Sequence, residues 1–164
     1  MARYDLEDLV DDVETLLKAK LNAQISAIEA EKVAVGKVAT ALAAVDDSAY
    51  FKLAWNDQAL NKNPALGIFV AEHSEESQGA DMVLNRYTIE IGIILSGTQN
   101  DALATKKLLR YVRALRQTFE QNHTRISGFV KESLKSIGPV DFTANVDSAE
   151  EYKIAGVSLQ IVVG

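Results

Sequence analysis

The sequence contains no cysteine, and this absence removes two kinds of chemistry. Without thiols the chain can form no disulfide, and it has no thiolate to bind a metal or attack a substrate. Its two histidines, His73 and His123, lack a second ligand at metal-binding spacing, such as a histidine four residues away. We therefore expect neither a metal nor a cofactor. His73 stands beside Glu72, Glu75 and Glu76, a stretch that we interpret as a solvated acidic loop.

Long apolar runs are also missing. None approaches the roughly 18 consecutive apolar residues that suggest a membrane span. The opening residues, MARYDLEDLVDD, have neither the basic start nor the apolar stretch of a secretory signal. We expect no membrane association and no secretion.

Motifs that carry catalysis are absent as well. The stretch VGKVAT around Gly36 and Lys37 faintly resembles a phosphate-binding loop, but the positions that need glycine and serine or threonine hold Glu31 and Val38. No G-x-S-x-G nucleophile elbow occurs. Nothing brings together a nucleophile, a base and an orienting group, so we expect that the protein is not an enzyme.

What the sequence has is the composition of one globular domain. It contains 164 residues, of which 48% are hydrophobic and 24% charged. A chain of this size buries roughly two-thirds of its unfolded surface, so we expect a single domain spanning residues 1–164. The formal net charge of -6 argues against general affinity for DNA or RNA, whose phosphates require a basic surface.

The N-terminal part predicts a helix. Apolar residues recur at three- and four-residue steps from about residue 5 to 22, and Ile25 and Ile28 could extend the helix to about 30. Acidic residues in its first turns suit the positive end of the helix dipole. Residues 31–49 are interpreted as a loop with a possible short helix, and residues 50–64 as irregular.

The rest of the chain predicts four strands and a second helix. Strands are expected at 65–72, 86–95, 140–147 and 152–163, and a helix at 101–121. Pro139 would open the third strand. The last strand changes the phase of its apolar residues, which favours a β-bulge at Ala155–Gly156. We therefore expect an α+β domain in which an antiparallel or mixed sheet of about four strands packs against helices, in the order helix-strand-strand-helix-strand-strand. The predicted core includes Tyr87, Ile89, Ile91, Ile93 and Leu95 from the second strand and Leu108, Tyr111, Val112, Leu115 and Phe119 from the second helix.

Charge is unevenly distributed along the chain. Residues 1–20 carry six acids and three bases, whereas residues 101–135 carry eight bases and three acids. The basic residues Lys106, Arg110, Arg113 and Arg116 follow one flank of the second helix, and the first helix begins with a group of aspartates that includes Asp8, Asp11 and Asp12. One interpretation is a solvated helix face. Another is a contact between subunits, in which the acidic edge of one copy meets the basic edge of the next and the chain of contacts closes into a ring. Direct DNA binding by the basic flank is a third, which the net charge disfavours.

The order of elements resembles that of the tail terminator, or tail completion, proteins of long-tailed bacteriophages, which are related in fold to phage tail-tube proteins. The resemblance covers the helix LEDLVDDVETLLKAKLNAQI, the strands NPALGIFVAE and RYTIEIGIILSG, the helix DALATKKLLRYVRALRQTF and the closing strands. It implies a structural virion protein that forms a hexameric ring, caps the tail tube at its final length and presents a docking ring to the neck of the head. Its partners would be the tail-tube protein and a neck or head-closure protein, and DNA would pass through the ring without specific binding. The protein would be made in the host bacterial cytoplasm and reside in the virion at the head-tail junction.

Two alternatives remain open at this point. One is another neck or tail-tube component of similar fold, which differs only in its position in the virion. The other is a cellular or prophage-encoded α+β module that binds a small ligand or a protein. A deep apolar pocket with converging polar groups would favour the second alternative.

Overall fold

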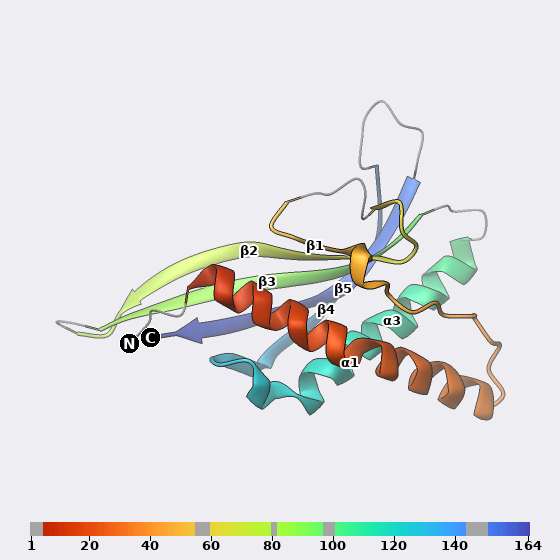
Figure 1. Cartoon of the computed structure of the whole chain (residues 1–164), viewed down its shortest axis with the longest axis horizontal. Helices are drawn as coiled ribbons and strands as arrows, with labels where there is room; N and C mark the ends of the chain where they lie inside the picture. The colour runs from red at the N-terminus through yellow and green to blue at the C-terminus, as the bar shows by residue number, and fades with distance from the viewer. Residues whose placement is uncertain (1–4, 55–59, 80–81, 97–100, 144–150) are drawn as a thin grey trace.

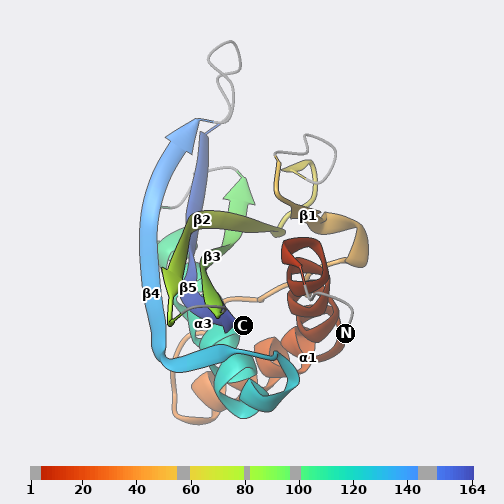
Figure 2. The ribbon, with the colours of Figure 1, turned by 90° about the vertical axis from the view of Figure 1, so that its left-hand side faces the viewer.

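The computed structural model describes residues 5–54, 60–79, 82–96, 101–143 and 151–164. It contains two long helices, five strands and two short 3-10 helices, in the order α1 (Leu6–Ala34), a 3-10 helix (Asp47–Ala49), β1 (Tyr50–Lys52), β2 (Ala65–Ser77), β3 (Val83–Ser96), α3 (Asp101–Gln121), a 3-10 helix (His123–Arg125), β4 (Phe129–Thr143) and β5 (Glu151–Val163). The strands form one sheet in the order β1-β2-β3-β5-β4, in which only the β1–β2 pair is parallel. Both helices cover the same face of this sheet (Figures 1 and 2). The predicted α+β class is confirmed.

The sheet has one strand more than the predicted four. The additional strand, β1, lies in a segment that we expected to be irregular, and it pairs Tyr50, Phe51 and Lys52 with the start of β2. Three residues are too few to establish an alternating pattern, so periodicity could not identify this strand.

Helix α1 is longer than the sequence predicted. It continues to Ala34 and stops at Gly36, whose positive φ of 78° favours glycine. The amides of Gly36 and Lys37 donate to the carbonyls of Val33 and Lys32, which is the hydrogen-bond pattern of a Schellman cap. Gly36, which lies in the segment that we interpreted as a loop, is therefore the residue that ends the helix.

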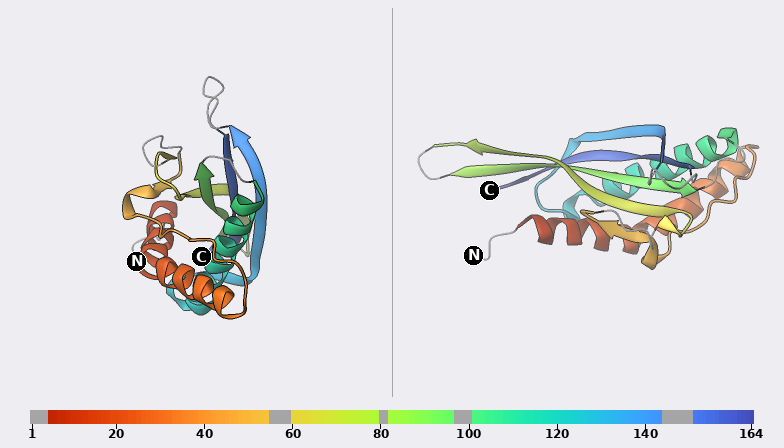
Figure 3. Two further views of the ribbon diagram at one scale, coloured as in Figure 1. Left: turned by 90° about the vertical axis from the view of Figure 1, so that its right-hand side faces the viewer. Right: turned by 90° about the horizontal axis from the view of Figure 1, so that it is seen from above.

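The hairpin formed by β2 and β3 is also longer than expected. We interpreted the stretch around His73 as a solvated acidic loop, but β2 continues to Ser77 and pairs with β3 from Val83. A bulge falls at Ala71, because Val70 pairs with Ile89 and Glu72 pairs with Thr88. Beyond this bulge β2 is exposed on both sides, so its sequence is polar throughout and resembles a loop. The end of the hairpin projects past both helices (Figures 1 and 3).

The main core lies between the helices and the sheet. Ile89, Ile91 and Ile93 are fully buried there, and Tyr87 packs against the same cluster. The cluster also contains the predicted residues of α3, together with eight residues of α1, from Leu9 to Ile28. The predicted core is thus confirmed.

A second, smaller core lies on the opposite face of the sheet. It includes Phe51, Ile94 and Tyr152, and the partly buried Phe69 and Ile154 pack against it. The rings of Phe51 and Phe69 meet edge to face, with centroids 5.6 Å apart. Tyr152 and Ile154 thus have a core of their own, which explains the change of phase in β5.

The predicted bulge at Ala155–Gly156 is wrong for the pairing of β5 with β3. Residues 152–163 of β5 pair with β3 without a register shift, because both of its phases face apolar surroundings. The irregularity lies opposite, in β4, where Ile137 and Val140 pair with Gly156 and Ile154. Gly156 itself is required by close packing, since a Cβ atom there would lie 1.8 Å from the carbonyl oxygen of Ile91.

Strand β4 differs most from its prediction. It begins at Phe129 rather than at 140, and it ends at Thr143, so that predicted residues 144–147 lie outside the described part of the chain. Pro139 stands inside the strand, at the register shift, and does not open it. Proline is tolerated there because β4 is an edge strand and the shift removes the need for a ladder donor. A second register shift between Val130 and Lys135 interrupts the apolar alternation, which hid the first half of the strand from sequence analysis.

Candidate subunit interface

The aspartates at the start of α1 are exposed, but Asp5, Asp8 and Asp11 already have local roles. Asp5 and Asp8 form a capping box: the Asp5 carboxylate accepts from the Asp8 amide at 3.0 Å, and the Asp8 carboxylate accepts from the Asp5 amide at 3.3 Å. Asp11 accepts a hydrogen bond from the Lys52 ammonium group. Asp12 is exposed on the same part of the helix. Helix capping thus explains part of the acidity that we assigned to an interface.

Lys52 joins β1 to α1 through two carboxylates. Its Nζ forms ion pairs with Asp11 and, at 2.9 Å, with Glu14, and Glu14 is also paired with Lys18. The hydrogen bonds to Asp11 and then to Glu14 raise the pKa of Lys52 to about 12. Partial burial alone would raise the pKa of Glu14, but the hydrogen bonds from Lys18 and Lys52 outweigh it and the pKa is lowered. This network holds the first strand against the first helix.

Arg110, the second residue of the predicted basic flank, is buried inside the molecule. Only 6% of the residue is exposed, and its guanidinium donates to Glu29 Oε2 at 2.7 Å, to the carbonyl of Val38 at 2.8 Å and to Thr40 Oγ1 at 3.3 Å. The Glu29 carboxylate also accepts from the hydroxyl and amide of Thr40 and from the amide of Ala41. Burial tends to raise the pKa of Glu29, but the hydrogen bonds from Arg110 and Thr40 prevail and lower it. The pair ties the crossover loop after α1 to both helices.

Arg113 and Arg116 are half exposed and are paired within the chain. The two Nη atoms of Arg113 donate to the two carboxylate oxygens of Glu31 at 2.9 Å and 2.7 Å. These hydrogen bonds lower the pKa of Glu31 and raise that of Arg113. Arg116 donates to Glu120 at 3.2 Å and to Ser136 Oγ on β4 at 3.3 Å. The acidic partners that the structure shows for these arginines thus belong to the same chain.

The structure does not bring the predicted acidic and basic groups together in one molecule. Within the described residues, no ion pair joins Asp8 or Asp11 to Lys106, Arg110 or the rest of the basic flank. The acids that meet α3 come from the other end of α1, at Glu29 and Glu31. Lys106 is exposed, and within the described part of the chain it has no ion pair. Of the four predicted basic residues, Lys106 is the most accessible to a partner and Arg110 is the least accessible.

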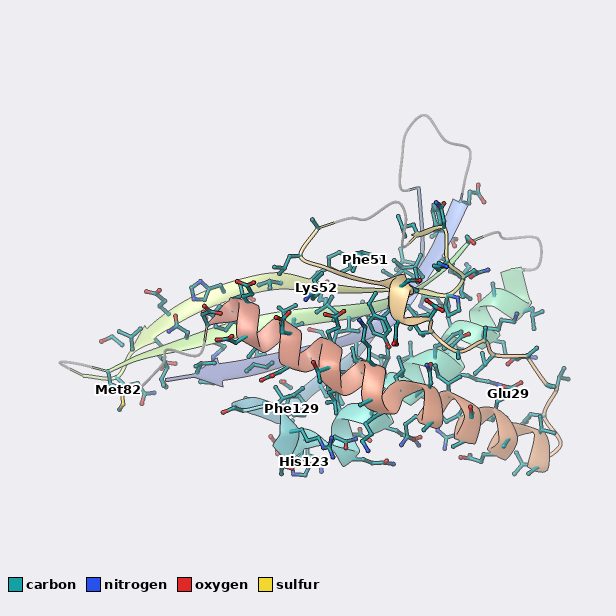
Figure 4. All side chains as sticks on the ribbon, in the orientation of Figure 1. Glu29, Phe51, Lys52, Met82, His123 and Phe129 are labelled. Atoms are coloured by element: carbon teal, nitrogen blue, oxygen red, sulfur yellow. The ribbon has the colours of Figure 1, made fainter. Side chains whose placement is uncertain are left out.

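Further basic residues lie beyond the predicted flank. Arg125 in the second 3-10 helix and Lys131 and Lys135 on β4 are exposed, and within residues 101–141 none of them forms an ion pair. Figure 4 shows His123 and Phe129 at this corner, where α3 leads into β4. Sequence analysis counted these cations in the basic segment but had no means of placing them, because β4 was not predicted to begin there.

The end of the β2–β3 hairpin is another exposed surface, and sequence analysis did not identify it as paired strands. We define the arm as residues 72–79 and 82–88. Its acids, Glu72, Glu75 and Glu76, are exposed, and so are Met82 and Val83, at 55% and 45%. In the sequence, residues 72–85 are a long polar connection, which we expected to be able to reach neighbouring rings.

A groove runs between α3 and β4. The helix side of the groove is lined by Leu109, Val112, Arg113, Arg116, Gln117 and Glu120, and the strand side by Ser136 and Gly138. Leu109 is 55% exposed, whereas Leu108, Val112 and Leu115 of the same helix are buried. The groove therefore combines an exposed apolar residue with two arginines that are already paired with Glu31 and Glu120.

The described residues contain no group of three or more histidine, aspartate or glutamate side chains arranged to hold a metal ion. No described helix is long and apolar enough to cross a membrane. Comparison with known proteins adds no relative, since no protein-family model matches the chain and no curated protein matches it.

Proposed function

We propose that this protein is a structural component of a bacteriophage tail, a tail terminator that caps the tube at its final length and forms the docking ring for the head. It would act by assembly rather than by catalysis, as a homo-oligomeric ring, with six copies as the expected number. It would bind the tail-tube protein on one side and a neck or head-closure protein on the other. It would be made in the bacterial cytoplasm and function at the head-tail junction of the virion.

The observation that carries this proposal is the one-sided covering of the sheet. Both helices lie on one face, whereas among the described residues the other face has only the small core around Phe51 and Tyr152 at one end. A sheet whose described residues leave most of one face uncovered is suited to line a ring, with the helices outside. The bulges in β2 and β4 would help such a sheet to curve.

The charge of the open face supports passage of DNA without binding. Strand alternation places Glu72, Glu76 and Glu90 on this face with Arg86 and Lys135, so that acids slightly outnumber bases. Six copies at -6 each would carry a formal charge of -36. A channel of this charge would repel phosphates and let the duplex slide.

Mass measurement provides the first test. Six copies of 17.9 kDa give about 107 kDa, and light scattering at moderate salt should show this species at high protein concentration. A protein that stays monomeric at every concentration and is absent from purified tails would contradict the proposal.

A phage test separates the terminator from its nearest alternative. A phage that lacks the protein should make tails of uncontrolled length if the protein is a terminator. Tails of normal length that fail to join heads would instead identify another junction component. Copurification of the monomer with a bound metabolite would favour a ligand-binding module over both.

A further inference from the structure

A small pocket lies on the face of the sheet that the two helices leave open. Its volume is about 140 Å³. Gly92 of β3 and Gly156 of β5 form its floor, because these two residues are paired across the strands and neither has a side chain. The pocket borders the second core, since Phe69 and Ile154 contribute to both. It is therefore a hollow at the boundary between the apolar and the polar part of this face.

The walls of the pocket are almost entirely apolar. Ile154 and Val140, which are paired with each other, stand on one side of the glycines, and Val140 is 54% exposed. Phe69 stands on the other side, and its ring leans over the sheet so closely that a Cβ atom on Gly67 would lie 2.6 Å from it. A volume of this size holds an unbranched chain of about five atoms at roughly 30 Å³ each. The pocket thus suits a short aliphatic chain.

One charged side chain stands in this apolar wall. Glu90 is paired with Phe69 and precedes Gly92 by two residues, so its side chain lies on the open face beside the pocket. The residue is half-buried, and within the described part of the chain its carboxylate has neither an ion pair nor a hydrogen bond. Lys135 lies in the same row of the sheet, on the far side of Ser158, and is not paired with it. The Glu90 carboxylate is therefore available to a cation from outside.

An apolar pocket with a carboxylate and an aromatic ring on one side has the chemistry that recognises a long aliphatic cation. A lysine side chain buries its methylene groups along apolar surface and keeps its ammonium group at polar partners. An ammonium group is attracted both by a carboxylate and by an aromatic ring. Arginine fits less well, because its guanidinium carries five donors and Glu90 is the only side-chain acceptor among the described residues of the pocket.

We infer that this pocket binds an alkylammonium group, supplied by a lysine side chain of a partner protein. The inference goes beyond the proposed function, because the whole pocket lies within one molecule and needs no ring to form. In the proposed ring the same face lines the channel, so the lysine would approach from the channel. The pocket and the ring can therefore be tested separately.

Binding of n-butylammonium tests the pocket directly. In isotope-labelled protein the amide signals of Gly92, Gly138 and Gly156 should shift, with a dissociation constant in the low millimolar range, which a ligand of five heavy atoms can reach. Methylammonium has the same charge but lacks three methylene groups, each of which contributes roughly fourfold in affinity when buried. It should bind at least about tenfold more weakly, and so should the uncharged n-butanol. Equal binding of all three compounds, or no shift of these signals, would overturn the inference.

A pair of matched variants tests the carboxylate. Glu90→Gln keeps the size of the side chain but removes its charge, and should weaken n-butylammonium binding at least about tenfold. Glu75→Gln removes the same charge from an exposed position of β2 outside the pocket, and should change the affinity by less than about twofold. Equal affinities of Glu90→Gln and the wild type would show that Glu90 does not hold the ligand and would refute the inference. The comparison of the three compounds needs no variant, so it decides the question even if Glu90→Gln fails to fold.

Attachment to a peptide backbone distinguishes the two sources of an alkylammonium group. Lysine blocked at both ends, as the N-acetyl methylamide, should bind at least as tightly as n-butylammonium and should lose affinity in Glu90→Gln. The free diamine 1,4-diaminobutane provides the comparison. If the free amines bind and the blocked lysine does not, the pocket takes a small amine and the assignment to a partner protein is wrong. A protein that binds the blocked lysine but stays monomeric at every concentration would retain this inference and contradict only the proposed function.

Discussion

Replacement of Arg110 by methionine tests how the two helices and the crossover loop are held together. Methionine keeps most of the length of the side chain but removes the guanidinium, which donates to Glu29, to the Val38 carbonyl and to Thr40. Glu29 would keep its hydrogen bonds from Thr40 and Ala41, but its charge would lose the only cation with which it is paired in the described residues.

The expected loss of stability follows from the burial of the Arg110–Glu29 pair. Arg110 is 6% exposed and the Glu29 side chain 18% exposed, so water replaces the lost contacts poorly. Removing one partner of a buried pair typically costs 3–5 kcal/mol, and the partial exposure of Glu29 favours the lower end, about 3 kcal/mol. For a domain of this size the melting temperature should fall by about 6–12 °C.

Arg113→Met is the matched control. Arg113 lies one turn further along α3 and pairs with Glu31 in the same way, but the two side chains are 35% and 51% exposed. Exposed pairs contribute little to stability, so its melting temperature should change by no more than about 2 °C. Thermal and urea unfolding of the two variants and the wild type would measure the difference. Equal effects would refute the claim that burial, rather than the ion pair as such, makes Arg110 important.

The pH dependence of the same variants provides a second check. The folded pKa of Glu29 lies below its ordinary value of 4.5, so its contribution to stability is fully present above about pH 4.5 and is lost as the pH falls through the folded pKa. The stability difference between wild type and Arg110→Met should therefore narrow in acid. A constant difference down to pH 2 would mean that the charge of Glu29 is not involved.

Three further outcomes can be measured on the same protein. Gly156→Ala should destabilise the fold by about 3 kcal/mol or more in urea unfolding, because the new Cβ would collide with the Ile91 carbonyl oxygen; a cost below about 1 kcal/mol would contradict the observed strand packing. Gly36→Ala should cost only about 1 kcal/mol, since the site is open and only its positive φ disfavours alanine. Tyr50→Phe should be neutral or slightly stabilising, because the buried Tyr50 hydroxyl has no hydrogen-bond partner in the described residues; a loss above about 1 kcal/mol in thermal unfolding would indicate that it has one.

Much of the fold could be predicted because one-sided burial leaves a periodic trace in the sequence. Ile89, Ile91 and Ile93 alternate with polar residues, and Leu108 and Leu115 recur at helical spacing, and all five are buried as predicted. Prediction failed where that trace is absent. The end of β2 is exposed on both sides, β1 is only three residues long, and the register shifts of β4 interrupt its alternation.

The candidate interface was only partly accessible to sequence analysis. The excess of basic residues after residue 100 is evident in the sequence, but which of them remain available depends on neighbours distant along the chain. Arg110 and Arg113 meet acids 81 and 82 residues away, whereas Lys135 meets none within the described chain. No spacing rule within α3 distinguishes these cases.

The sequence by itself determined the chemical character of this protein and the faces of its long elements. It has no thiol and no recognisable catalytic motif, it has an acidic net charge, and the spacing of its apolar residues determines which side of each helix and of the central strand is buried. Tertiary structure alone decided which charges are paired, that the apolar phase shift in β5 serves a second core rather than a bulge, and that a polar segment forms a projecting arm. The physical reason is the separation along the chain of the residues that each feature depends on. Burial of one face repeats every two or three to four residues and is visible locally, whereas ion pairs, opposite sheet faces and open edges depend on contacts between segments that only folding brings together.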